Sequence, residues 1–295
     1  MSLEVKNLTH IYNKGTVMES YAVKNVSFTL EDGSFVGLIG HTGSGKSTLI
    51  QHLNGLETPT EGTVLFHGED IFKPGYDLRR LRGKVGLVFQ YPEYQLFEET
   101  VLKDVMYGPI NMGLSEKEAG DRAKEALARI GLGEQYWERS PFELSGGEKR
   151  RAAIAGILAM EPEVLILDEP AAGLDPGGRR RMLDMIGSLH REKHMTVLLV
   201  SHSMEDVAEY ADKLMVMDKG ELIFYAEPRE VFRHVRELEN CGLSIPEITY
   251  LAHDLKDAGF DIDTDISTVN EAFAEICKIF GIKSENEEDQ ADNCI

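Results

Sequence analysis

The sequence is poor in cysteine and has no long apolar run. Its 295 residues include three cysteines, Cys241, Cys277 and Cys294, and none of them stands in a C-x-x-C spacing. This scarcity argues against a disulfide framework and a zinc site, and it fits a reducing cytoplasm. The longest apolar runs, such as Val164–Leu167 and Thr196–Val200, are too short to span a bilayer. If a membrane matters here, the chain must reach it through a partner.

The chain also has few basic residues for its length. Lysine and arginine number 31 against 51 aspartates and glutamates, which gives a net charge of −20. A protein that binds nucleic acid through its phosphates needs the opposite balance, so no nucleic-acid partner is expected. The basic clusters at 79–82 and 179–181 are interpreted as solvated helix faces. The chain starts with a strand-like pattern, and no signal peptide is predicted.

What the sequence does contain is a phosphate-binding loop. Gly40–Ser47 satisfies G-x-x-x-x-G-K-[ST], between an apolar run that predicts a buried strand and a stretch that predicts a helix. Its glycines let backbone amides turn toward one anion, and the helix dipole adds to the attraction. A chance glycine turn before a helix is the alternative, and the surrounding strand and helix make it improbable. The predicted nucleotide-binding positions are Gly40, His41, Thr42, Gly43, Ser44, Gly45, Lys46, Ser47 and Thr48.

Within that loop, the pattern assigns separate roles to two side chains. Lys46 is expected to reach the β- and γ-phosphates, and the Ser47 hydroxyl is expected to hold Mg²⁺. The sequence therefore predicts a nucleoside triphosphate site that contains a magnesium ion.

Apolar runs that alternate with amphipathic stretches predict an α/β fold with a mostly parallel sheet and an antiparallel N-terminal β subdomain. Strands are predicted over residues 3–8, 21–30, 35–39, 62–66, 85–89, 164–167, 196–200, 213–218 and 221–225. Helices are predicted over residues 46–53, 115–130, 178–193, 204–210, 228–238, 248–258 and 269–280, and one more begins at Ser145.

Two carboxylates follow the apolar run at 164–167. Asp168 and Glu169 stand at the carboxyl end of that strand, which is where ligands bind in open α/β sheets. In phosphate-loop enzymes such an aspartate helps to hold Mg²⁺. A water that attacks the γ-phosphate needs its proton accepted, which the second acid can do. An ordinary polar strand end is the alternative, and the phosphate loop favours the functional interpretation.

A second anion-binding helix start lies at Leu144-Ser145-Gly146-Gly147-Glu148. A serine followed by two glycines exposes backbone amides, a hydroxyl and the positive end of the helix dipole. One nucleotide needs one phosphate cradle, and this chain carries two. The motif alone is weak, and its position shortly before Asp168 and Glu169 makes it discriminating.

Together these motifs resemble the ATPase subunit of an ATP-binding-cassette transporter, over about residues 1–230 and in the family's order. The matches are Gly40–Ser47 to the Walker A motif, Gln90 to the Q-loop, Leu144–Glu148 to the signature, Val164–Glu169 to Walker B, Gly173–Pro176 to the D-loop and His202 to the switch histidine. The resemblance implies that Glu169 polarises the attacking water, that His202 contacts the γ-phosphate, and that Gln90 meets the metal and the water. Tyr12 resembles the aromatic residue that stacks on adenine.

The resemblance further implies that two such subunits close face to face around ATP. The positions that would act on the opposite nucleotide are Ser145, Gly146, Gly147, Glu148 and Asp175. The implied cofactors are ATP and Mg²⁺, and the implied metal-binding positions are Ser47, Gln90 and Asp168.

Finer features resemble the energy-coupling-factor group, which imports vitamins and transition-metal ions. They are the stretch Phe89–Phe97, the loop start Gly40–Gly43, the signature-helix residues Glu148, Lys149 and Gly156, and the region Glu237–Ala258. The Tyr-Pro-Glu-Tyr version of the Q-loop suggests the second of two paralogous ATPases. The implied partners are a second ATPase subunit, identical or paralogous, an integral membrane coupling subunit and a substrate-binding membrane subunit. The implied location is the cytoplasmic face of the cell membrane.

The domain boundaries follow from the motifs and from a change in composition after Pro228. A nucleotide-binding domain is predicted over residues 1–230, with a helical signature subdomain at about 92–160. A mostly helical extension that favours dimerisation is predicted over 231–283, and an acidic disordered tail over 284–295.

Other classes of protein stay open. A non-transport ATPase of the same superfamily that acts on DNA or ribosomes is one, although long coiled coils and a second cassette are absent from the sequence. A phosphate-loop kinase or GTPase is another class, but it would not explain the second anion-binding helix start at Leu144–Glu148. The sequence also has no Asn-Lys-x-Asp motif for guanine recognition. A regulatory module without transport would look the same in sequence. No residue pattern in this chain identifies the transported compound.

Overall fold

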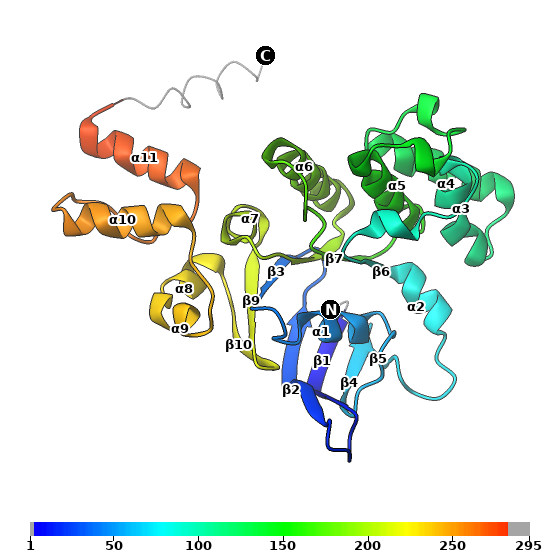
Figure 1. Ribbon diagram of the computed structural model, residues 1–295, viewed down its shortest axis with the longest axis horizontal. Coiled ribbons are helices and arrows are strands. Elements are labelled where there is room, and N and C mark those ends of the chain that lie inside the picture. Colours follow the sequence, from blue (N-terminus) through cyan, green and yellow to red (C-terminus); the bar gives the residue numbers. More distant parts are fainter. Residues whose placement is uncertain (1–2, 283–295) are drawn as a thin grey trace.

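The computed structural model describes residues 3–282 (Figure 1). The strands are β1 Leu3–Tyr12, β2 Ser20–Leu30, β3 Phe35–Ile39, β4 Glu61–Phe66, β5 Glu69–Asp70, β6 Val85–Val88, β7 Val164–Asp168, β8 Thr196–Val200, β9 Lys213–Asp218 and β10 Glu221–Ala226. The helices are α1 Lys46–Leu53, α2 Leu78–Lys84, α3 Val101–Asn111, α4 Glu116–Arg129, α5 Gly146–Leu158, α6 Pro176–Lys193, α7 Met204–Tyr210, α8 Pro228–Phe232, α9 Val235–Asn240, α10 Glu247–Asp257 and α11 Val269–Phe280. The predicted tail at 284–295 lies outside the described residues, as does Cys294.

Two sheets form the centre of the molecule, and they confirm the predicted fold class. The six-stranded sheet has the order β10-β9-β3-β8-β7-β6, and only β10 pairs antiparallel in it. The four-stranded sheet has the order β2-β1-β4-β5 and is antiparallel throughout. Strands β3, β6, β7 and β8 of the larger sheet are buried on both faces, which explains their continuous apolar sequences. Among residues 3–282, no helix has both the length and the apolar character that crossing a bilayer requires.

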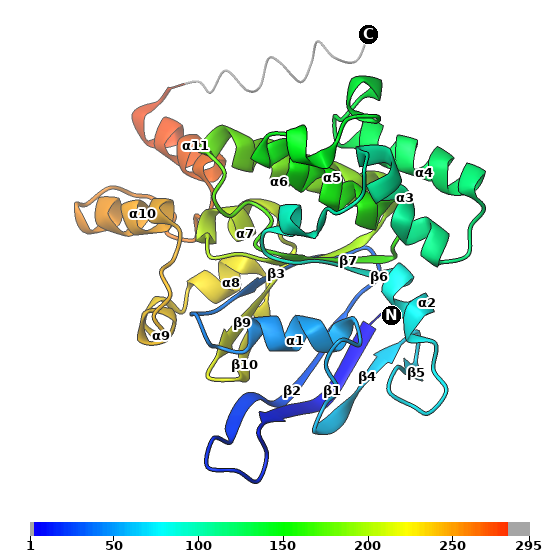
Figure 2. The ribbon, with the colours of Figure 1, turned by 45° about the vertical axis from the view of Figure 1, so that its right-hand side comes forward.

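Alternate residues of each parallel strand enter different cores. In β7, Val164 and Ile166 belong to the core between the two sheets, which also holds Leu49 and Leu53 of α1. The intervening residues of β7 face α6 on the other side. Figure 2 shows α1 between the sheets and α6 above the larger one. The helix that follows the phosphate loop is therefore packed on both sides, so the loop at its start is held in a fixed place.

The helices α3, α4 and α5 gather around a core of their own beside the sheet edge formed by β6 (Figure 1). The predicted capping box is confirmed, because the Ser115 side chain accepts from the Glu118 amide and Glu118 bonds back to Ser115. Sequence patterns missed α2, because most of its residues are basic or glycine and only Leu81 and Gly83 are buried. The domain boundaries at 92, 160 and 230 remain predictions.

The single helix predicted over 228–238 is wrong. The structure has two short helices there, α8 and α9, and His234 between them leaves helical geometry. Both Phe232 and Leu238 are buried against the β9–β10 edge of the sheet. In one continuous helix these side chains would point about 120° apart, and the break at His234 lets both of them face the sheet.

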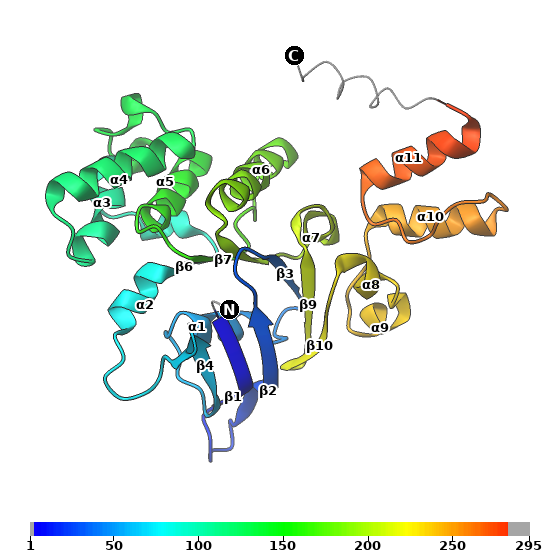
Figure 3. The same ribbon diagram turned by 180° about the vertical axis from the view of Figure 1, so that it is seen from behind.

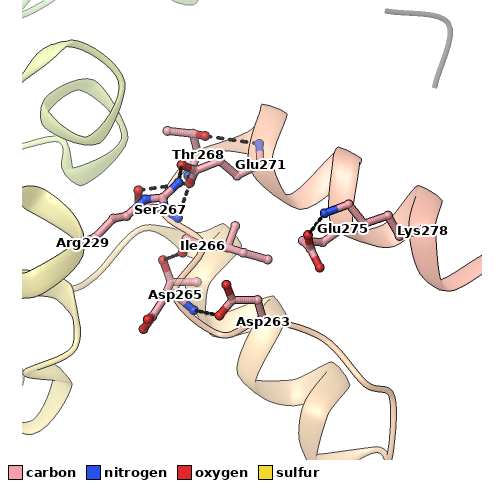
Figure 4. A network of polar contacts seen from close by, with 10 residues as sticks. Arg229, Asp263, Asp265, Ile266, Ser267, Thr268, Glu271, Glu275 and Lys278 are labelled. Carbon is pink, nitrogen blue, oxygen red and sulfur yellow. Dashed lines mark hydrogen bonds and ion pairs between the residues drawn. The ribbon is translucent and has the colours of Figure 1, made fainter. Parts of the chain in front are cut away.

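The last two helices, α10 and α11, project from the rest of the molecule (Figure 3). Figure 4 shows how they are tied to it: the Arg229 guanidinium of α8 pairs with Glu271 of α11. The same Glu271 carboxylate accepts hydrogen bonds from the backbone amides of Ser267 and Thr268 at 2.9 and 3.1 Å, which caps α11. The Thr249 hydroxyl of α10 donates to the Ile266 carbonyl at 2.6 Å. The pair thus forms a small unit with defined polar anchors.

Candidate functional site

The phosphate loop lies between β3 and α1, and close neighbours leave no room for a side chain at two of its glycines. A Cβ at Gly40 would come within 2.5 Å of the Met217 carbonyl oxygen and of the Ser44 hydroxyl. Gly45 has a φ of +103°, and a Cβ there would overlap the Ala22 carbonyl oxygen. The loop is therefore wrapped tightly by its neighbours, and its backbone has no room for side chains at these positions.

Lys46 lies inside this loop and is only 7% exposed. Its ammonium donates to the Gly40 and His41 carbonyl oxygens at 2.6 and 3.1 Å. Burial lowers the pKa of Lys46, and the negative charges of Glu169 and Asp168 oppose that shift. A buried cation between loop amides and two carboxylates is suited to hold phosphate oxygens at a defined point.

The remaining loop residues show where an anion fits. The Ser44 hydroxyl is buried and has no hydrogen-bond partner within the described part of the chain. The His41 imidazole lies 2.9 Å from an Asp218 carboxylate oxygen, which ties the loop to the end of β9. Thr42 and Gly43 are exposed at the tip. A buried hydroxyl without a partner, in the same loop as a buried ammonium, fits a site for a phosphate group.

Asp168 ends β7 next to this loop. Burial raises its pKa, the charge of Glu169 raises it further, and Lys46 and the Ser47 hydroxyl act in the opposite direction. The predicted metal-binding residues Ser47 and Asp168 therefore lie close enough to influence each other. Among residues 3–282, no cluster of three His, Cys, Asp or Glu side chains is suited to hold a metal by itself. These oxygens fit Mg²⁺, which commonly takes one carboxylate and completes its shell with phosphates and water.

The three predicted catalytic residues meet at one carboxylate. The Gln90 amide donates to one oxygen of Glu169 at 3.0 Å, and the His202 imidazole lies 2.6 Å from the other. Glu169 itself has a φ of +51°, which is rare for a residue with a long side chain. A carboxylate held from both sides in this way is placed to accept a proton from a water near the loop.

Tyr12 lies near the start of α1, at the end of β1. Its hydroxyl is 3.3 Å from the Thr48 hydroxyl, and its ring packs edge-on against His10 with centroids 4.5 Å apart. Tyr12 is 38% exposed. The structure therefore brings the predicted adenine-stacking residue to the helix that follows the phosphate loop.

Behind Tyr12 lies a buried histidine pair that sequence reasoning missed. His52 Nε2 is 3.0 Å from His10 Nδ1, and His52 Nδ1 donates to the Thr48 carbonyl at 2.7 Å. His10 Nδ1 is also 3.2 Å from the Thr58 carbonyl oxygen. His10 and His52 lie on separate elements, so nothing in the local sequence pattern predicts the pair. It holds the strand that carries Tyr12 against α1.

The signature and D-loop residues lie elsewhere. Ser145 caps α5, and its hydroxyl and backbone amide donate to the Glu148 carboxylate at 2.7 and 2.8 Å. Asp175 caps α6, because its carboxylate accepts from the Gly178 amide at 2.9 Å. Gly146 and Gly147 form the first turn of α5, and no Cβ contact would form there within 4 Å. In Figure 2, α5 and α1 lie on opposite sides of the larger sheet. Within residues 3–282, no hydrogen bond joins Ser145–Glu148 or Asp175 to the phosphate loop.

Comparison with known proteins gives a consistent result. The sequence profile of the ABC transporter family matches residues 23–172. The chain is 54% identical to the energy-coupling factor transporter ATP-binding protein EcfA2 of Clostridium tetani, over 97% of this chain and 100% of that protein. It is also 54% identical to EcfA2 of Clostridium perfringens, over 92% of this chain and 96% of that protein.

Two solved structures extend the comparison to the fold. The first is cbiO1 from Clostridium perfringens, which is described as part of the ABC transporter complex cbiONQ. It superposes with a TM-score of 0.72 and is 35% identical, and the match covers 86% of this chain and 98% of that one. The second is a dimeric post-hydrolysis state of the ATP-binding cassette MJ0796 bound to ADP and Pi, with a TM-score of 0.69, 30% identity, and coverage of 77% and 98%.

The buried histidine pair generates a prediction about acid stability. Burial lowers the pKa of His52 below the ordinary value of 6.5. Between the lowered pKa and 6.5, the unfolded chain binds a proton that the folded chain does not. The free energy of unfolding therefore falls as the pH drops through this window, by at most about 1.4 kcal/mol per pH unit. Replacing His52 by glutamine, which keeps a donor and an acceptor, should flatten this dependence.

Urea denaturation between about pH 5 and pH 8 measures the effect. The matched control is His67→Gln, which changes an exposed histidine that pairs with Glu163 outside the core. An unchanged pH dependence in His52→Gln, or an equal change in the control, would show that the buried pair does not titrate as described.

Proposed function

This chain belongs to the ABC transporter family, and we propose that it binds and hydrolyses ATP to energise a membrane importer of the energy-coupling-factor type. The observation that carries the proposal is the meeting of Gln90 and His202 on the Glu169 carboxylate, next to the buried Lys46. Vitamins or transition-metal ions are the class of cargo. A soluble ATPase without a transport role is the alternative. Similarity over nearly the whole chain to transporter subunits favours transport.

The chemistry is divided among the residues at the sheet edge. The amides of Gly40–Ser47 and the Lys46 ammonium bind the phosphates of ATP. Ser47, Asp168 and Gln90 would hold Mg²⁺, which neutralises charge on the phosphates when bound. Glu169 accepts a proton from the attacking water, and His202 fixes the orientation of that carboxylate. Tyr12 offers its exposed ring face to the adenine base.

The hydrolytic site requires a second subunit. Ser145, Gly146 and Asp175 are exposed, Gly147 and Glu148 are half-buried, and the hydrogen bonds of Ser145 and Asp175 stay within their own helix starts, so this surface is accessible to the nucleotide of an opposite subunit. The exposed amides at the start of α5 form the second phosphate cradle. Hydrolysis then requires closure of the pair, because each nucleotide needs groups from both subunits. The second subunit is either a copy of this chain or a paralogue.

The surface that faces the membrane partner lies beside Gln90. A groove of about 450 Å³ runs between the Q-loop, α2 and α3, and Leu96, Phe97, Tyr107 and Met112 contribute to its walls. Phe97 and Tyr107 are both about half exposed, at 57% and 49%, and pack edge to face. Exposed aromatic side chains around a groove indicate a protein-binding surface. An integral membrane subunit docked there would place this chain at the cytoplasmic face of the membrane.

The projecting helices supply a second contact between the ATPase subunits. On α11, Val269, Phe273 and Phe280 are more than half exposed and recur at a spacing that places them on one face. The small core of α10 and α11 lies under a different face. An exposed apolar stripe on an anchored helix pair is suited to hold two subunits together while their nucleotide sites open.

The assignment of base and binding residue predicts two different defects. Replacing Glu169 by glutamine keeps the shape but removes the proton acceptor, so the ATPase rate should fall by about 10²- to 10⁴-fold with ATP affinity retained. Lys46→Ala should instead weaken ATP binding itself, because a phosphate ligand is lost. Steady-state hydrolysis and an equilibrium binding titration separate the two. Wild-type turnover by the Glu169→Gln protein would refute its role as base.

The groove predicts a membrane partner that co-purifies. Affinity purification from detergent-solubilised membranes should recover an integral membrane subunit with the wild-type chain. Phe97→Glu places a charge in the groove and should reduce that recovery severalfold, because the charge loses hydration on docking. Tyr21→Glu is the control, because it changes an aromatic residue that is similarly exposed, 51%, on β2 away from the groove. Recovery of no membrane protein with the wild-type chain would favour the soluble alternative.

The apolar stripe predicts pairing through α11. Phe273→Glu should weaken association of the ATPase subunits by about tenfold or more, since a buried interfacial aromatic residue is replaced by a charge. Asn270→Glu introduces the same charge at an exposed polar position of α11 and serves as the control. Sedimentation equilibrium measures both. Equal dimer dissociation constants for the two variants would place the subunit contact elsewhere.

A further inference from the structure

Arg150 is a buried arginine whose contacts join the signature helix to two loops at the proposed site. It belongs to α5, the helix that begins at the signature, and is 3% exposed. Its guanidinium binds both carboxylate oxygens of Glu93, with Nε at 3.1 Å and Nη2 at 2.8 Å. Its third nitrogen donates to the carbonyl oxygens of Pro170, at 3.2 Å, and of Ala172. All three guanidinium nitrogens are therefore used.

These contacts connect the segment after Gln90 to the segment after Glu169, the proposed base. Glu93 stands three residues after Gln90, and Pro170 follows Glu169 directly. Gln90 and Glu169 are themselves hydrogen-bonded at 3.0 Å, so each end of that bond lies next to a segment that Arg150 holds. Displacement of either segment would change the distance between the Gln90 amide and the Glu169 carboxylate.

The backbone of both segments needs such support. Tyr91 has a φ of +57° and Glu169 a φ of +51°, values in the left-handed region that side chains larger than glycine disfavour. Residues in this region persist where surrounding contacts fix them. The Arg150 guanidinium lies 5.8 Å from the Tyr91 ring and bonds to the carbonyl of the residue after Glu169. It is placed to fix both strained residues.

Arg150 and Glu93 form an ion pair in which the carboxylate is charged. Burial alone would raise the pKa of Glu93, but the hydrogen bonds and charge of Arg150 outweigh it, and the net shift is downward. Glu93 is therefore ionised at neutral pH. Lysine cannot replace arginine here, because a single ammonium cannot make parallel bonds to a carboxylate and also reach two carbonyls.

We propose that Arg150 is a positioning residue for ATP hydrolysis, which holds the Q-loop and the turn after β7 so that the Glu169 carboxylate is aimed at the attacking water. This inference rests on the proposed role of Glu169 as the base. Arg150 touches neither nucleotide nor water and acts through Glu93, Pro170 and Ala172. Because it belongs to the signature helix, it also joins this chain's own base to the helix that serves the opposite nucleotide.

The test is the ATPase activity of the assembled complex, with the subunit pair and its membrane subunits reconstituted in lipid. Arg150→Met removes the guanidinium and keeps the length of the side chain. It should lower kcat by about 10- to 100-fold, the usual cost of a misplaced reacting group, while KM and the binding constant for ATP change less than about twofold. Arg150→Lys should recover only part of the loss.

A double-mutant cycle separates positioning from general damage. If Arg150 acts through Glu169, Arg150→Met should add less than about twofold to the loss already caused by Glu169→Gln. Two independent effects would multiply instead. The matched control is Arg129→Met, since Arg129 also bridges two carboxylates, Glu125 at 3.1 Å and Glu192 at 2.8 Å, away from these loops. Its kcat should stay within about twofold of the wild type.

Glu93→Gln provides a second route if Arg150→Met does not fold, because it removes the charge and keeps the shape. It should lower kcat in the same direction, with an unchanged melting temperature and ATP affinity as the check on folding. Wild-type kcat in folded Arg150→Met or Glu93→Gln, or multiplicative losses in the cycle, would overturn the inference. Wild-type turnover by Glu169→Gln alone would overturn the proposed function instead.

Discussion

Parallel pairing of β3, β8 and β7 is the constraint on which the rest of the structure depends. Their register aligns Leu38 with Val200 and Asp168 with the same Val200, so all three strands end at one edge. The phosphate loop, the two carboxylates and the switch histidine follow these ends directly. The register of the sheet therefore places groups that are more than 100 residues apart in sequence at the same edge.

The groups at this edge attract an anion, although the molecule as a whole is negatively charged. The chain carries a net charge of −20, yet it is built to hold a polyanionic nucleotide. Attraction must then come from short-range groups: loop amides, the α1 dipole and the ammonium of Lys46, which is only 7% exposed. Burial concentrates these partial charges where solvent screening is weak. The net charge of a whole protein therefore says little about a binding site whose own buried groups set the local field.

The sequence allowed most of the fold to be predicted, because its signals are local. Buried parallel strands read as short apolar runs, and β8, β9, α7 and α11 have the predicted bounds. Gln90, Glu169 and His202 were assigned to one nucleotide site by the family resemblance, and the hydrogen bonds that join them at the Glu169 carboxylate came from the structure. Arg150 and the His10–His52 pair were not predictable, since each depends on contacts across 20 to 57 residues of sequence. The break near His234 likewise arises from burial of Phe232 and Leu238 against the sheet.

The separation of Ser145 from Lys46 has a consequence for mixed assemblies. In a pair of subunits, each nucleotide would be held by the phosphate loop of one and capped by the signature of the other. A defect in the loop would then disable the site on its own subunit, whereas a defect in the signature would disable the site on its neighbour. Two differently damaged subunits could consequently complement each other and restore one intact site, or leave none, depending only on which halves they retain.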